Sequence, residues 1–171
     1  MADYFATGGI FEYRGRMAVV SGDTGYCPSI VKQSQNVDLL VHEACACHLI
    51  EQMRGVMADA STPETDRLER MMEDLSQPNV HAAPEVVMRT AAEANVKHLA
   101  YTHIVPPMRN PLIRRMWQSN IKPDPDWKGD WTVGEDGMHF AFPDGREGND
   151  SMVTVCFKID GFCTNNDGFS V

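Results

Sequence analysis

The stretch at residues 79–103, NVHAAPEVVMRTAAEANVKHLAYTH, joins a helix directly to a strand. Pro84 favours a helix start, because its fixed φ suits the first helical turn and its missing N–H is not needed there. Apolar residues then recur at helical spacing, and 97–103 is strand-like and ends on His103. His81 lies in the loop before the helix. A helix followed at once by a strand indicates layers of helix packed against sheet.

The same alternation continues on both sides of this stretch. Turn residues predict a strand hairpin that reverses at Arg14-Gly15 and a last hairpin that reverses near Asp136-Gly137. Strands alternating with amphipathic helices predict an α/β or α+β fold. The remaining segments are, in order, a hairpin at 9–21, a strand at 37–44, a helix at 49–57, a helix that starts at 61 or 62, a short helix at 111–119, a hairpin at 130–145 and a strand at 152–159.

Length and composition limit the class of protein. The 171 residues are 43% hydrophobic and 23% charged, which is ordinary for a soluble globular domain. The net charge of −9 argues against a general nucleic-acid binder, although it leaves room for a small, locally basic cleft. No stretch resembles a membrane span or a signal peptide, and the five cysteines form no regular framework, so we expect a cytoplasmic protein with free thiols.

Acidic and imidazole side chains follow three of the predicted strands. Asp23 comes after the apolar run VVSG, His42 and Glu43 end the strand at 37–44, and His103 ends the strand after the helix. Ligands gather beyond the carboxyl ends of strands in α/β sheets, so these groups could converge with His81. Carboxylates and imidazoles suit Zn²⁺, Mn²⁺ or Fe. The alternative is that each is an ordinary turn or surface group satisfied by local hydrogen bonds.

Four motifs in this order resemble a known family. They are SGDTG at 21–25, DLLVHEA at 38–44, the stretch at 79–103, and VGEDGMHFAFP at 133–143. Together they resemble the C-terminal half of a metallo-β-lactamase-fold hydrolase, in the branch that includes ribonuclease Z and its arylsulfatase-like relatives. The resemblance implies half of an αβ/βα sandwich, a β-sheet with helices packed on one face. It assigns 1–145 to that half-domain and leaves 146–171 as an extra strand and tail.

The resemblance also implies roles for particular residues. Asp23 matches the aspartate that bridges two metal ions, and His103 matches a histidine that binds one of them. Glu43 and His81 match a pair that donates a proton to the leaving group. The implied metals are Zn²⁺, or Mn²⁺ or Fe, with two ions if another chain completes the site. Gly22 would let the backbone turn, and Ser21 and Thr24 are candidates to orient the Asp23 oxygens.

The chain also departs from the family pattern. The family's first metal motif places two histidines one residue apart, and none of the six histidines here is spaced in that way. The residues after His103 are IVPP, where ribonuclease Z has a serine and an arginine, and a helical insertion separates Glu43 from His81. These departures predict a truncated form and argue against tRNA processing in particular.

Three functions remain open at this point. The first is a metal-dependent hydrolase of an ester-type bond, such as a phosphodiester, sulfate ester or lactone. The second is a catalytically inactive half-domain that acts as an assembly or binding module. The third is a small metal site in HEACACH, residues 42–48, although small buried cysteines at a helix start are the plainer interpretation. We expect a homodimer or other homo-oligomer, or a missing N-terminal half, a small-molecule ester-like substrate, no membrane contact, and no general nucleic-acid binding.

Overall fold

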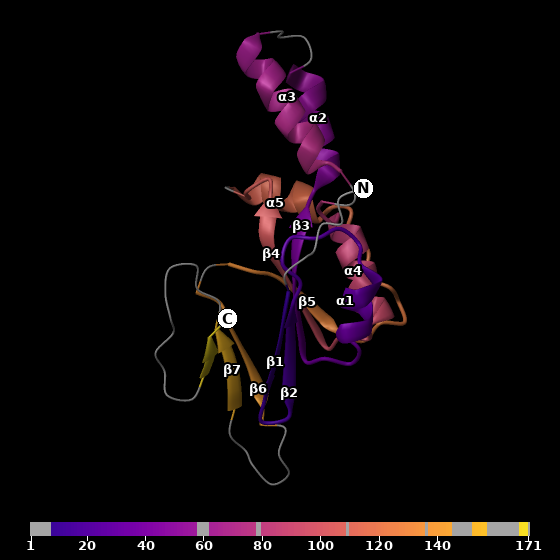
Figure 1. Cartoon of the computed structure of the whole chain (residues 1–171), viewed down its shortest axis with the longest axis vertical. Coiled ribbons are helices and arrows are strands. Elements are labelled where there is room, and N and C mark those ends of the chain that lie inside the picture. The colour runs from indigo at the N-terminus through magenta and orange to yellow at the C-terminus, as the bar shows by residue number, and fades with distance from the viewer. Residues whose placement is uncertain are drawn as a thin grey trace.

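A computed structural model of the chain describes residues 8–57, 62–77, 80–108, 110–135, 137–144, 152–156 and 168–170. Its centre is a five-stranded sheet in the order β1-β2-β3-β4-β5 (Figure 1). The β1–β2 pair is antiparallel, as the predicted hairpin requires, and the other three pairings are parallel. The strands are β1 (Gly9–Tyr13), β2 (Arg16–Val20), β3 (Leu39–Cys45), β4 (His98–Val105) and β5 (Asp130–Val133).

Helices cover one face of this sheet. The helices are α1 (Pro28–Gln33), α2 (Cys47–Met57), α3 (Pro63–Leu75), α4 (Pro84–Glu93) and α5 (Pro111–Gln118). The main apolar cluster joins α1, α4 and α5 to alternate residues of the strands, for example Val87 and Trp117 to Leu40 and Leu99. The α/β class and the packing of helices on one face are confirmed. The short α1, which begins at a proline, was not predicted.

Strand β3 shows how sequence periodicity divides the two faces. Every one of its residues is buried, as expected for a central strand of a parallel sheet. Leu40 faces the helices, whereas Leu39 and Val41 belong to a second apolar cluster on the opposite face. The same alternation places His42 on the helix side and Glu43 on the other side.

A second, three-stranded sheet lies over that opposite face. It contains β6 (His139–Pro143), β7 (Met152–Cys156) and β8 (Gly168–Ser170). Phe140 of β6 packs on Leu39, Val41 and Ala100 of the central sheet. The predicted hairpin at 130–145 is therefore wrong, because β5 pairs with β4 and β6 pairs with β7. The burial of Phe140 against the central sheet stabilises this arrangement more than a local β5–β6 turn would. One of the predicted turn residues, Asp136, lies outside the described residues.

The second sheet bears on two earlier expectations. Because β6 pairs with β7, the paired strands lie on both sides of the expected division at residue 145. A half-sandwich alone would expose one large apolar face of its sheet, which favours a homodimer, but here β6 packs on part of that face. A dimer stays a prediction.

The helices α2 and α3 form a hairpin that projects beyond the end of the sheet (Figure 1). Thr62 begins α3 with a capping box, in which Thr62 and Thr65 each bond the other's backbone N–H. At the base of the hairpin, Ile50 and Met72 pack against Cys45 at the end of β3. This hairpin is the insertion expected between Glu43 and His81.

Two glycines provide a matched test of packing. A Cβ at Gly129 would lie 2.3 Å from the Val96 carbonyl oxygen and 2.4 Å from the Trp127 ring, whereas one at Gly55 in α2 would meet nothing within 4 Å. We expect Gly129→Ala to lower the free energy of unfolding by about 1–3 kcal/mol. Gly55→Ala should raise it by up to about 1 kcal/mol. Urea unfolding of both variants checks this, and equal effects would contradict the packing around Trp127.

None of the helices in the described ranges is both long and apolar enough to span a membrane. The expected cytoplasmic location stays a prediction.

Candidate functional site

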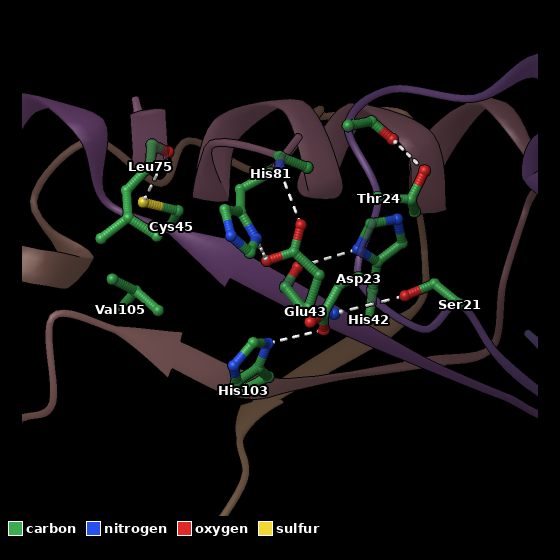
Figure 2. Close-up of polar contacts among 12 residues, drawn as sticks. Ser21, Asp23, Thr24, His42, Glu43, Cys45, Leu75, His81, His103 and Val105 are labelled. Atoms are coloured by element: carbon green, nitrogen blue, oxygen red, sulfur yellow. Dashed lines mark hydrogen bonds and ion pairs between the residues drawn. The ribbon is translucent and has the colours of Figure 1, made fainter. Parts of the chain in front are cut away.

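Four segments meet at the carboxyl edge of the central sheet (Figure 2). Asp23 follows β2, Glu43 lies near the end of β3, His103 lies near the end of β4, and His81 comes from the loop before α4. Parallel strands bring their carboxyl ends to one edge, which is why residues so far apart in sequence converge here. All four residues singled out from the sequence therefore lie in one place.

The loop that carries Asp23 turns sharply at Gly22. Gly22 has a φ of 65°, a region that suits glycine, as the sequence predicted. The Ser21 hydroxyl donates to the Gly22 carbonyl oxygen at 2.7 Å, and the Thr24 hydroxyl donates to the Gly25 carbonyl oxygen at 3.1 Å. Each hydroxyl has one proton, and here it is used within the loop. Ser21 and Thr24 thus shape the loop and do not donate to the Asp23 carboxylate.

Glu43 is held by hydrogen bonds in a buried position. Its Oε1 accepts from the Ala82 N–H at 2.7 Å, and its Oε2 lies 3.1 Å from Nδ1 of His81. Only 1% of the Glu43 side chain and 7% of the His81 side chain are exposed. Burial raises the pKa of Glu43 to about 7, although the hydrogen bond from Ala82 opposes this rise. A carboxyl group that titrates near neutrality can share a proton with the imidazole beside it.

The position of Ala82 is itself fixed by β3. The Ala82 carbonyl oxygen accepts from the Cys45 N–H at 2.8 Å, while its own N–H bonds Glu43. The loop that carries His81 is thus bonded to two residues of the same strand. This double attachment positions the imidazole against the Glu43 carboxyl group.

His103 occupies an irregular place in β4. Thr102 pairs with Glu43 and Ile104 pairs with Ala44, so His103 is the extra residue of a bulge. Its φ is 40°, which is unusual for a residue with a side chain. Bulges often redirect side chains at functional sites. Here the bulge brings His103 Nδ1 to 2.6 Å from Asp23 Oδ1, and about half of each side chain is exposed.

These groups fit a divalent metal ion. Within the described part of the chain, one ligand atom each from Glu43, His81 and His103 lies within 4.8 Å of the others. The His81 and His103 rings are 5.9 Å apart between centroids. With Asp23 beside His103, the cluster offers carboxylate oxygens and imidazole nitrogens, which is the donor set of Zn²⁺, Mn²⁺ and Fe sites. Which metal binds is a prediction that the arrangement does not test.

The Cys/His cluster considered at 42–48 does not assemble. His42 is buried, and its Nδ1 donates to the Glu43 carbonyl oxygen at 2.8 Å. Burial lowers the pKa of His42 to about 4, so its ring is neutral at pH 7. His48 instead bonds the Met116 carbonyl oxygen at 3.3 Å. The two histidines have separate partners, and the described residues that could hold a metal do not include the cysteines.

Comparison with known proteins supports the resemblance found in the motifs. The chain is 34% identical over 90 residues to ribonuclease Z of Myxococcus xanthus (strain DK1622), which covers 53% of this chain and 22% of that protein. It is 32% identical over 95 residues to ribonuclease Z of Synechococcus sp. (strain CC9311), which covers 56% and 23%. No family profile matches the chain. The chain thus spans less than a quarter of the length of these curated relatives.

Among solved structures, the metallo-β-lactamase fold protein YhfI from Bacillus subtilis aligns over 75% of this chain and 41% of its own, at 18% identity and a TM-score of 0.46. The relationship of this chain to ribonuclease Z rests on the sequence matches. Over about half of its length the chain is similar in sequence to proteins named ribonuclease Z, the branch that the motifs resemble. In particular, it is ribonuclease Z-like.

These relatives correct the expected partner. A small-molecule ester-like substrate, with nucleic-acid binding unlikely, is the wrong expectation for a chain whose curated relatives are named as ribonucleases. The physical reason is that a net charge of −9 is a sum over the whole chain. It does not report the field inside one cleft, where a metal ion can be the largest local charge.

The sequence did not reveal the backbone groups that hold Glu43. The Ala82 N–H donates to its carboxylate, and the Thr24 backbone also donates to it. Both are main-chain N–H donors, which every residue type except proline supplies, so no sequence motif could identify them.

Proposed function

We propose that this chain carries the residues that cleave a phosphodiester bond in a metal-dependent RNA hydrolase. One observation carries the proposal: Asp23, Glu43, His81 and His103 converge at one sheet edge of a ribonuclease Z-like chain. The inactive half-domain expected as an alternative is the outcome that remains if the chain takes up no metal and does not cleave RNA.

In this proposal Asp23 and His103 hold the metal, and Glu43 and His81, although their ligand atoms also lie within reach of an ion bound at His103, act on the proton of the leaving group. When bound, the metal supplies charge for the phosphate oxygens and lowers the pKa of a water molecule toward about 7. Asp23 Oδ1 now lies 2.6 Å from His103 Nδ1, so the two side chains are already in contact before a metal enters. Two ligands are fewer than the three or four of a protein zinc site, so further ligands must complete the coordination.

Glu43 and His81 act together as the general acid that protonates the leaving oxygen. His81 uses Nδ1 to bond Glu43, which leaves its Nε2 as the nitrogen that can face a substrate. Glu43 fixes the tautomer and the orientation of the ring. The proton is given to the leaving alkoxide oxygen, and a buried carboxyl group with a pKa near 7 can restore it to the imidazole.

The test uses an end-labelled RNA in which one linkage is followed for cleavage, with Mn²⁺ or Zn²⁺ added to the whole chain. We expect metal-dependent cleavage that stops when a chelator is added. We also expect a linkage with a 2′-O-methyl group to be cut, because water and not the neighbouring hydroxyl is the nucleophile. Cleavage that survives the chelator, or that requires the free 2′-hydroxyl, would refute the proposal.

Precursor tRNA serves as a second substrate in the same assay. The residues IVPP after His103 predict no preference for precursor tRNA over an unstructured RNA. A strong preference for the precursor would show that this departure from ribonuclease Z does not set the substrate.

A further inference from the structure

The segment HEACACH, residues 42–48, contains two cysteines that the proposed reaction does not use. Cys45 is the last residue of β3 and Cys47 is the first of α2, so the chain turns from strand to helix between them. The turn places the two thiol side chains next to each other. Cys47 Sγ also lies 3.5 Å from the Cys45 carbonyl oxygen, and both cysteines are free thiols.

The two thiols have different surroundings. Cys45 is fully buried against Ile50 and Met72, and its Sγ lies 3.7 Å from the Leu75 carbonyl oxygen at the end of α3. Cys47 is partly exposed and stands at the N-terminus of an 11-residue helix, where the backbone N–H groups favour negative charge. The pair thus contains an accessible nucleophile and a buried neighbour in contact with it.

We propose that Cys45 and Cys47 form a dithiol site that exchanges with low-molecular-weight disulfides and closes to an intramolecular disulfide. The Cys47 thiolate attacks one sulfur of the disulfide RSSR, whose S–S bond breaks and releases RS⁻. The Cys45 thiol then loses its proton and attacks Cys47 Sγ of the mixed disulfide, which releases a second RS⁻. The two thiolates take up the two protons, so RSSR is reduced to two RSH and the protein pair is oxidised by two electrons.

The closed disulfide has a structural consequence at the base of the α2–α3 hairpin. Cys45 Sγ no longer has a proton for the Leu75 carbonyl oxygen at the end of α3. The hairpin therefore loses one of its contacts with β3, although the apolar packing of Ile50 and Met72 remains.

The test exposes the native chain to oxidised glutathione, blocks remaining thiols with N-ethylmaleimide and maps the tryptic peptides by mass spectrometry. Cleavage after Lys32 and Arg54 yields one peptide, 33–54, that contains both cysteines and no other. We expect this peptide to lack two hydrogens and to carry no maleimide. Cys45→Ser should instead accumulate glutathione on Cys47. Cys47→Ser should leave Cys45 unmodified, because Cys45 is buried.

Cys27→Ser is the matched control, since Cys27 is partly exposed but belongs to α1's N-terminus and not to this pair. It should leave the disulfide in peptide 33–54 unchanged. Two results would overturn the proposal: a wild-type peptide that carries maleimide on both cysteines, or a Cys45→Ser chain with no more glutathione on Cys47 than wild type has. Circular dichroism of each variant before oxidation verifies that the native fold is the state tested.

Discussion

Replacing Asp23 with asparagine is expected to abolish both metal retention and metal-dependent RNA cleavage. Asparagine keeps the size of the side chain but removes the negative charge and one of the two equivalent ligand oxygens. Because the metal supplies several kcal/mol of transition-state stabilisation, the rate should fall by at least about a thousandfold. Metal per chain, measured by mass spectrometry after dialysis, should fall together with the rate.

Asp126→Asn is the control for this change. Asp126 is an exposed aspartate in the loop before β5, away from the strand ends that carry the site. It should retain wild-type metal content and rate. If Asp23→Asn retained metal as well as wild type does, the proposed role of Asp23 as a ligand would be wrong, whatever happened to the rate.

Replacing Glu43 with glutamine should lower the rate of cleavage without loss of metal. Glutamine can still accept the Ala82 N–H, but it cannot hold a proton for His81. General acid catalysis is worth about a hundredfold to ten-thousandfold, and we expect a loss within that range for both Glu43→Gln and His81→Gln. The double variant should be little worse than either single variant, because the two residues act as one unit.

A substrate with a different leaving group can distinguish proton donation by Glu43 and His81 from a purely structural role. An aryl phosphodiester such as bis(p-nitrophenyl) phosphate releases a stable phenolate that needs no proton. Glu43→Gln and His81→Gln should therefore lose much less activity on this substrate than on RNA. Equal losses on both substrates would mean that the pair supports the fold or the metal and does not donate a proton.

The sequence predicted the alternation of strands and helices well because the signals for it are local. The strand β3 follows from the apolar run Leu39–Val41, and the start of α4 follows from Pro84. The β5–β6 hairpin was mispredicted because Asp136-Gly137 is a typical sequence for a turn between two neighbouring strands. Pairing of β6 with β7 instead depends on Phe140 finding the open face of a sheet formed by distant residues.

The candidate site shows the same division. The residue types at three strand ends, together with the family motifs, pointed to Asp23, Glu43, His81 and His103. Their contacts could not be predicted, because they depend on a bulge at His103 and on main-chain donors. The partial exposure of Asp23 and His103, against the burial of Glu43 and His81, likewise comes from the tertiary structure.

The double attachment of Ala82 to β3 has an evolutionary consequence. The chain leaves the sheet after Cys45 and returns to it at Ala82. The two hydrogen bonds that hold Ala82 there join its carbonyl oxygen to the Cys45 N–H and its N–H to the Glu43 carboxylate. Everything between these points can therefore lengthen or shorten while His81 keeps its place. Each doubling of such a connection costs only about 0.6 kcal/mol in closure entropy. Descendants of a common ancestor could thus gain or lose a helical hairpin here, and acquire new surfaces, without rebuilding the candidate site.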